Sequence, residues 1–275
     1  APAAAAPAQR VDPNLSHREY KERLACQGIM QDTDGGKPLK YRQLVTGPDA
    51  EAWLEASSQE WDRLHHMSTL KFVPATSKPS DHKATYLKHV CGEKIKPPGT
   101  ELLKRVRTTA GGDKIDYDGT TAAYTAGLKT VKTLWNSVLS TPHAKFMTID
   151  VKDFYLHSRL HTPEYAWVPL AQIPPATQLK YNVADLIVDG KVLVEITGGL
   201  YGLPQAGLLA QQDLIKLLEA NGYYMTKTSC LFRHRTRDIS FSLIVDDFGV
   251  KYTKEADVEH LLTTLHTKYK THIDW

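Results

Sequence analysis

Two apolar segments that each end in aspartate, far apart in the chain, constrain this protein more than any other feature. The residues Phe146-Met147-Thr148-Ile149 lead into Asp150, and the segment 239–245 leads into the doublet Asp246-Asp247. Both segments have the length and composition of β-strands. If the two strands end side by side, three carboxylates gather at one edge of a sheet.

Such a cluster has a chemical consequence. Two carboxylates about 4 Å apart repel each other by roughly 1–4 kcal/mol at moderate to high effective dielectric. A cation relieves this repulsion, and hard oxygen ligands suit magnesium. Paired divalent ions held by carboxylates catalyse in-line phosphoryl transfer. An isolated Asp-Asp doublet is more often a solvated turn, so the prediction of a metal site depends on the two segments meeting.

The remaining periodicity predicts an α+β fold, with an antiparallel sheet backed by helices on one face and free on the other. The turn pair Asp189-Gly190 predicts a β-hairpin. Further strands are expected at 102–110, 165–168, 231–233 and 250–252, and helices at 49–67, 122–139, 204–221 and 256–269. We expect a disordered or irregular segment over 1–40, one subdomain over 41–140 and a second over 141–275.

Composition excludes several classes of protein. The chain is 41% hydrophobic and 24% charged, which is typical of a globular protein. It has no membrane-spanning run and no signal-peptide pattern, so we expect an intracellular protein that does not interact with membranes. Its three cysteines show no Cys-x-x-Cys spacing, which argues against a disulfide framework or a zinc knuckle.

Positive charge is concentrated in one segment. Residues 71–114 contain ten Lys or Arg and four Asp or Glu, a balance of +6, so the rest of the chain sits near −3 within the net +3. A basic segment beside an acidic metal site suits a polyanionic substrate. Taken alone, the same charge more often marks a solvated surface.

A third motif lies between the two acidic ones. It reads Leu200-Tyr201-Gly202-Leu203-Pro204-Gln205-Ala206-Gly207. The three motifs, in this order, resemble the reverse transcriptase of copia-type LTR retrotransposons. The resemblance covers residues 41–275 and is strongest from Phe146 to Tyr252.

The resemblance implies the fingers and palm of a right-hand polymerase. Its activity would be RNA-directed DNA synthesis with two Mg²⁺ ions, for which Mn²⁺ could substitute, and its partners an RNA or DNA template-primer and dNTPs. Asp150 and Asp246 would bind the metals, and the carbonyl of Val151 is an extra candidate ligand. Asp247 is expected to have a supporting catalytic role, because successive side chains of a strand point to opposite faces.

The same resemblance implies substrate contacts. Tyr155 would be a steric gate that excludes ribonucleotides, and Gln205 would lie beside the incoming nucleotide. Arg107 is the first candidate for clamping the triphosphate, because guanidinium matches phosphate oxygens. Lys104, Arg105 and Lys114 compete with it for that role.

The chain departs from the family pattern in two places. Ile244 stands where relatives often have tyrosine, and the glycine-rich primer-grip strand expected after the last helix is missing. We expect a polyprotein fragment without its thumb, with integrase upstream and RNase H downstream, and with weak or no processive synthesis. The alternatives are a decayed nucleic-acid-binding module and another two-metal palm enzyme such as a nucleotide cyclase.

Overall fold

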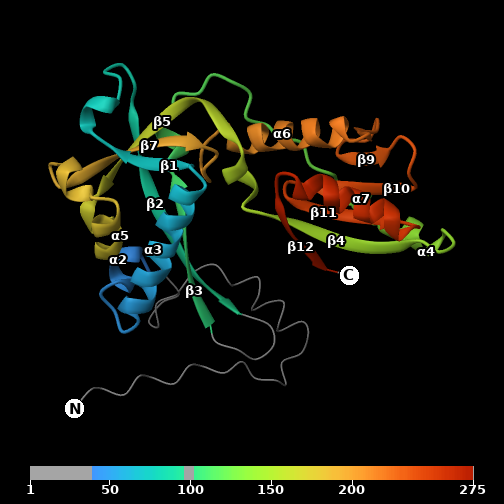
Figure 1. The fold of residues 1–275 in the computed structure, drawn as a ribbon, viewed down its shortest axis with the longest axis horizontal. Coiled ribbons are helices and arrows are strands. Elements are labelled where there is room, and N and C mark those ends of the chain that lie inside the picture. The colour runs from blue at the N-terminus through green and yellow to red at the C-terminus, as the bar shows by residue number, and fades with distance from the viewer. Residues whose placement is uncertain (1–38, 96–101, 275) are drawn as a thin grey trace, which may run out of the picture. The chain divides into compact units, whose positions relative to one another are not determined.

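The computed structural model describes residues 39–95 and 102–274, which form two compact units (Figure 1). The first unit runs to Ile115 and takes in Glu164–Ile196, and the second comprises Asp116–Pro163 and the chain from Thr197. The sequence predicted one boundary between 140 and 141, whereas the chain passes between the units three times. The predicted disordered segment 1–40 lies almost wholly outside the described residues.

The first unit contains a mixed sheet with strand order β1-β7-β5-β2-β3. Strands β2 and β5 run parallel, and β6 pairs with β7. Asp189 and Gly190 have φ of 50° and 70°, so the predicted hairpin is confirmed with the two positive φ values of a type I′ turn. The strands are β1 (Leu70–Val73), β2 (Ala84–Ile95), β3 (Leu102–Ala110), β5 (Arg159–Pro169), β6 (Ile187–Val188) and β7 (Lys191–Gly198).

Helix α3 (Ala50–His66) packs against β3, the strand at the sheet edge. Its stripe of Trp53, Trp61 and Leu64 is buried, which confirms the predicted amphipathic helix. Glu60 is also buried, and its carboxylate accepts a hydrogen bond from the Thr108 backbone N–H of β3 at 2.9 Å. The other helical segments are α2 (Tyr41–Leu44), η1 (Ala75–Ser77), η2 (Gly112–Lys114), η4 (Leu170–Gln172), α5 (Pro175–Lys180) and η5 (Val183–Leu186).

The second unit contains a sheet with strand order β12-β4-β11-β10-β9-β8, and its recorded pairs are antiparallel. Helices α6 (Ala206–Ala220) and α7 (Glu255–His266) supply Leu214, Leu218 and Leu261 to one core with the apolar face of the sheet. The strands are β4 (Lys145–Lys152), β8 (Tyr223–Met225), β9 (Leu231–His234), β10 (Ile239–Ile244), β11 (Asp247–Tyr252) and β12 (Lys270–Asp274), and η3 spans Phe154–His157.

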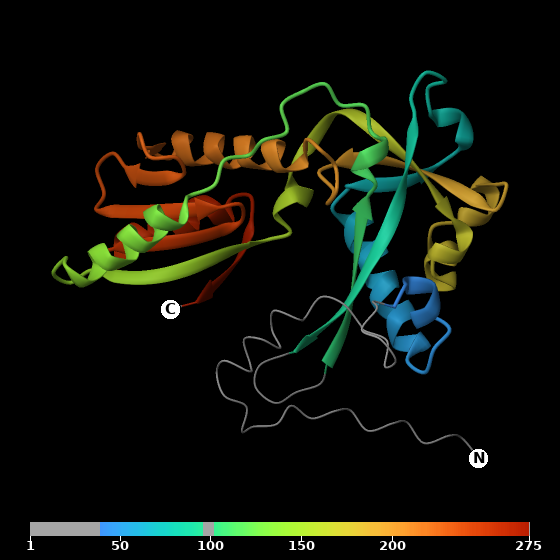
Figure 2. The same ribbon diagram turned by 180° about the vertical axis from the view of Figure 1, so that it is seen from behind.

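Helix α4 (Leu128–Leu139) corrects two expectations. It begins at Leu128 rather than at 122, after an extended segment. It also lies on the sheet face opposite α7, as the two opposite views show (Figures 1 and 2). On that face Trp135 contacts Phe146, with ring centroids 4.2 Å apart, and the Lys251 ammonium donates to the Ser137 carbonyl at 3.0 Å. Helices therefore cover part of both faces, and the second face is not wholly open.

The α+β class is thus confirmed, but the sheet of the first unit is mixed instead of antiparallel, because β2 and β5 run parallel. In the part of the chain that the structure describes, no helix combines the length and apolarity needed to span a membrane.

Candidate metal and nucleotide site

The two acidic segments meet as neighbouring strands of the second unit. Strand β4 pairs with β11 in a register that sets Asp150 directly opposite Asp247. Met147, Ile149 and Val151 are buried on the core side of β4, so the alternating Asp150 points to the other face. Residues directly opposite in an antiparallel pair share a face, so both carboxylates project from the same side of the sheet.

The hydrogen-bond pattern brings these side chains close together. The Val151 backbone N–H donates to the Asp246 carbonyl at 3.0 Å, which makes that pair hydrogen-bonded. The neighbouring pair, Asp150 and Asp247, is then of the non-hydrogen-bonded kind, in which Cα atoms are about 4.5 Å apart and side chains are closest. The fold places two carboxylates where their mutual repulsion is near its maximum for a sheet.

A strained turn produces this arrangement. Ile244 pairs with Asp247, so Val245 and Asp246 form the two-residue turn between β10 and β11. Val245 has φ of 58°, a left-handed conformation that costs a β-branched residue about 1–3 kcal/mol. Strain of this kind persists only where the surrounding structure imposes it, and here the β4–β11–β10 ladder does so.

The electrostatics agree with the geometry. Partial burial, and then the negative charge of Asp150, raise the pKa of Asp247 above its ordinary value. Both side chains are exposed, so a substrate or ion can reach them. The turn also separates the doublet: Asp247 faces Asp150, whereas the charge of Asp246 acts on Tyr155. Sequence reasoning ranked Asp246 above Asp247, and the register favours Asp247 as the partner of Asp150.

Replacing Asp247 with Asn is therefore expected to stabilise the metal-free protein at neutral pH. A carboxyl whose folded-state pKa is raised destabilises the fold once it is ionised, so the gain appears above the ordinary pKa near 3.8 and vanishes below it. Because solvent screens this pair, we expect about 1 kcal/mol or less. Urea unfolding with EDTA at pH 7 and at pH 3.5 measures it, and a gain that persists unchanged at pH 3.5 would contradict the assignment.

Tyr155 lies beside the acidic turn. It is part of η3, and its ring meets that of Tyr201 edge-on, with centroids 5.1 Å apart. Burial raises the pKa of Tyr155, and the charge of Asp246 and then Tyr201 raise it further. The structure thus brings the predicted gate residue, the third motif and the acidic doublet into one neighbourhood.

Gly199 fastens the third motif to the segment that carries Tyr155. Its N–H donates to the Ser158 carbonyl at 3.0 Å, and the Ser158 hydroxyl donates to the Tyr155 carbonyl at 2.8 Å. A Cβ added at Gly199 would lie 2.4 Å from both the Ser158 hydroxyl oxygen and the Tyr155 carbonyl oxygen. Sequence reasoning missed both Gly199 and Ser158, although the Gly198-Gly199 doublet is a signal of close backbone approach.

Gln205, Gly202 and Gly207 of the third motif differ in burial and in backbone conformation. Gln205 precedes the first turn of α6 and is 5% exposed. Gly202 has φ of 90° and requires glycine, whereas a Cβ at Gly207 would make only ordinary contacts, the nearest at 3.7 Å to the Tyr155 hydroxyl. Of these two glycines, only Gly202 therefore shows a conformational need for glycine.

The basic candidates belong to the first unit, on β3. Lys104 faces α3, where its ammonium lies 2.6 Å from the Asp49 carboxylate and also pairs with Glu93. Burial alone would lower the pKa of Lys104, but the hydrogen bonds to Asp49 and Glu93 outweigh it and raise the pKa. Arg105 and Arg107 point to the opposite face of the strand. This geometry argues against Lys104 as a phosphate ligand, because its charge is already paired with two carboxylates.

His272 is a neighbour of the carboxylates that sequence reasoning did not select. Strand β12 pairs with β4 on the side away from β11, and its register sets His272 directly opposite Asp150. His272 is exposed on the same face, so Asp247, Asp150 and His272 form a row across three strands. No sequence pattern marks this histidine, because its position depends on the pairing of β12.

The donor set fits a hard divalent cation that is only partly held by protein. Over residues 39–95 and 102–274, no group of three or more His, Cys, Asp or Glu side chains is placed so that it could hold a metal ion. Magnesium is commonly held by one or two carboxylates together with substrate phosphates and water, and a pair of exposed, mutually repelling carboxylates matches that requirement. Asp150 and Asp247 are the residues that would hold it, with Asp246 and the Val151 carbonyl close by.

Comparison with known proteins identifies no family: no protein-family model matches the chain, and no curated protein matches it.

Proposed function

We propose that this chain is the fingers and palm portion of an RNA-directed DNA polymerase of the copia retrotransposon type. One observation carries the proposal: Asp150 and Asp247, far apart in sequence, are direct cross-strand partners on one face of an antiparallel sheet. The acidic turn beside them is adjacent to Tyr155, which the family resemblance assigns to nucleotide selection. This combination suits a nucleoside triphosphate better than a structural cation.

The protein's own residues would mainly position the substrates and neutralise their negative charge. Divalent ions at the carboxylates would activate the primer 3′-hydroxyl and offset the charge of the triphosphate. Asp150 and Asp247 fix where positive charge is concentrated, because the β4–β11 register holds them in place. The turn at Val245 sets Asp246 outside that cross-strand pair, and the charge of Asp246 acts on Tyr155.

In this proposal Tyr155 selects deoxynucleotides by shape. A ring beneath C2′ of the sugar would clash with a ribose hydroxyl, and the edge-on contact with Tyr201 limits the movement of that ring. For the triphosphate, the resemblance proposes Arg107 as the first candidate ligand, with Arg105 as an alternative. Gln205 is proposed to help hold the base pair being formed.

Replacing Tyr155 with Val is expected to reduce discrimination against ribonucleotides by about tenfold or more, since a lost steric contact of this size is worth on the order of 1–3 kcal/mol. Tyr155→Phe keeps the ring and is the matched control, which should discriminate as the wild type does. The measurement is kcat/KM for dCTP and CTP on one template. Equal discrimination by Tyr155→Val and wild type would remove the gate from the proposal.

The proposed function is tested by template-directed incorporation of one labelled dNTP onto a primer. Four templates differing only in the first unpaired base should each select the complementary dNTP, in the presence of Mg²⁺ or Mn²⁺. Duplex binding without incorporation would instead indicate a non-catalytic binding module, and cyclisation of a free nucleotide would indicate a different palm enzyme.

A further inference from the structure

Helix α4 carries a polar face that points directly away from the sheet. Lys129, Lys132, Thr133 and Asn136 follow the i, i+3, i+4, i+7 spacing of a single helix face, and all four are exposed. Leu134, on the opposite side of the helix, is buried against the sheet. We call these four residues the polar face of α4.

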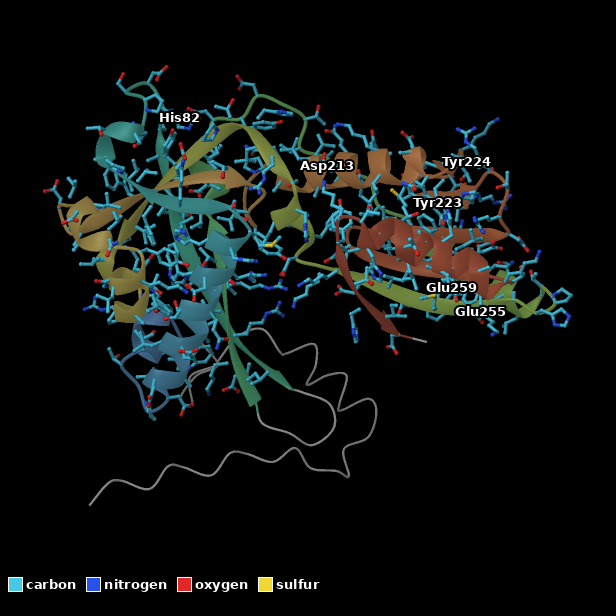
Figure 3. The ribbon with its side chains drawn as sticks, viewed as in Figure 1. His82, Asp213, Tyr223, Tyr224, Glu255 and Glu259 are labelled. Carbon is cyan, nitrogen blue, oxygen red and sulfur yellow. The ribbon has the colours of Figure 1, made fainter. Side chains whose placement is uncertain are left out.

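The charge of this helix differs from that of its neighbours. Helices α6 and α7, which pack on the other side of the sheet, carry acidic residues, among them Asp213, Glu255 and Glu259 (Figure 3). Helix α4 has two lysines and no acidic residue. The side chains of its polar face are therefore hydrogen-bond donors and cations, the groups that contact phosphate oxygens.

Helix α4 and the carboxylates lie on the same face of the sheet. The helix lies on the same side of the sheet as Phe146, Gly249 and Lys251, which is also the face of Asp150 and Asp247. Just before the helix, the Ala126 N–H donates to the Leu243 carbonyl, near the acidic turn. At its far end, Lys251 contacts Ser137 and Thr141. The helix therefore runs away from the carboxylates for about 18 Å.

We propose that the polar face of α4 binds the phosphate backbone of the nucleic-acid duplex that extends from the carboxylates. The direction of the duplex rests on the proposed function, whereas the binding of a polyanion rests on the charge and exposure of the helix. Lys129 and Lys132 make the ionic contacts, and Thr133 and Asn136 donate hydrogen bonds.

A second copy of the chain fits the helix less well. Leu128, Trp135 and Leu139 are 69%, 49% and 90% exposed and form an apolar line beside the polar face. A contact along one helix of this length falls short of the 1,200 Å² or more, by a rough standard, of a stable interface. Pairing two such helices would also bring four lysines together without a compensating acidic group on α4.

The test is the salt dependence of duplex binding by the full chain. Fluorescence anisotropy with a labelled primer-template, in Ca²⁺ to prevent turnover, is measured for the wild type and for Lys129→Gln/Lys132→Gln. Each lost phosphate contact reduces the slope of log K against log salt by about 0.9, so the double variant should lose about 1.8. Between 50 and 200 mM salt, the wild-type affinity should fall about twelvefold more than that of the variant.

Two controls make the result specific. Lys129→Arg/Lys132→Arg keeps the charges and should bind as the wild type does. Lys216→Gln/Lys227→Gln removes two exposed lysines that lie outside α4, and should leave the slope unchanged. If the slope of log K against log salt falls only in the α4 glutamine variant, the proposal is supported even if the chain incorporates no nucleotide.

Three results would overturn it. The first is a wild-type slope retained by the α4 glutamine variant, and the second is an equal loss in the Lys216/Lys227 control. The third is a wild-type dimer in sedimentation velocity that Leu128→Ser/Leu139→Ser dissociates while duplex binding stays unaltered, which would assign α4 to a protein interface.

Discussion

Asp150→Asn is expected to lower template-directed nucleotide incorporation by about a thousandfold. Asp150 is the central residue of the row formed by Asp247, Asp150 and His272, so its loss removes one of two carboxylates from any shared cation. Metal-assisted charge stabilisation is worth several kcal/mol, and each 1.36 kcal/mol changes the rate about tenfold. Single-turnover incorporation with Mg²⁺ measures the effect.

The fold of this variant should be intact, because the substitution relieves repulsion between Asp150 and Asp247. Its affinity for a primer-template should remain within a few-fold of wild type. Asp274→Asn is the matched control: Asp274 is exposed on the adjacent strand β12, where it pairs with Thr148 rather than with a carboxylate. An Asp150→Asn protein that incorporates nucleotide at the wild-type rate would contradict the catalytic assignment.

Gly199→Ala is expected to cost about 1–3 kcal/mol of unfolding free energy and to impair incorporation at the same time. The new Cβ would meet the Tyr155 carbonyl oxygen and the Ser158 hydroxyl oxygen at 2.4 Å, and a backbone atom cannot rotate away as a side chain can. The segment must shift, and it carries Tyr155 with it. Urea unfolding gives the first quantity, and KM for the incoming dNTP gives the second.

Gly127→Ala is the control for this effect, because an added Cβ there meets nothing within 4 Å. A glycine-to-alanine change gains about 0.4–1 kcal/mol through the unfolded chain, but Gly127 is the N-cap of α4, where glycine is preferred to alanine. The two effects oppose each other, so Gly127→Ala should change the free energy of unfolding much less than Gly199→Ala does. If Gly199→Ala unfolds at the same urea concentration as wild type and keeps its KM, Gly199 does not fasten the two motifs.

Local signals were sufficient for most of the secondary structure. The Asp189-Gly190 hairpin, helix α3 and the strand that carries Asp150 were all predicted, because turn chemistry and periodicity are encoded by neighbours in sequence, although β4 continues to Lys152 instead of ending at Asp150. Helix α4 started later than predicted, since the Ala126 N–H bonds to Leu243 of β10 instead of to a helical carbonyl. The residue at which the helix begins therefore depends on a residue far away in the chain.

The candidate site was likewise predicted only in part from the sequence. The meeting of the two acidic segments was predicted from their motifs, but the pairing partner of Asp150 was not, because it depends on the two-residue turn at Val245. His272 and Gly199 were missed since each matters only through a distant strand or backbone segment. Lys104 illustrates the converse: as a lysine in a basic stretch it resembled a phosphate ligand, whereas its charge is taken up by Asp49 and Glu93.

The most direct measurement is Mn²⁺ binding by electron paramagnetic resonance, made on the chain with a primer-template and a non-hydrolysable dNTP analogue. We expect saturable binding by the wild type and by Asp274→Asn, and a large loss of affinity in both Asp150→Asn and Asp247→Asn. Equal Mn²⁺ affinity in all four proteins would show that the paired carboxylates do not share a cation, and the proposed nucleotidyl transfer would then have no centre in this fold.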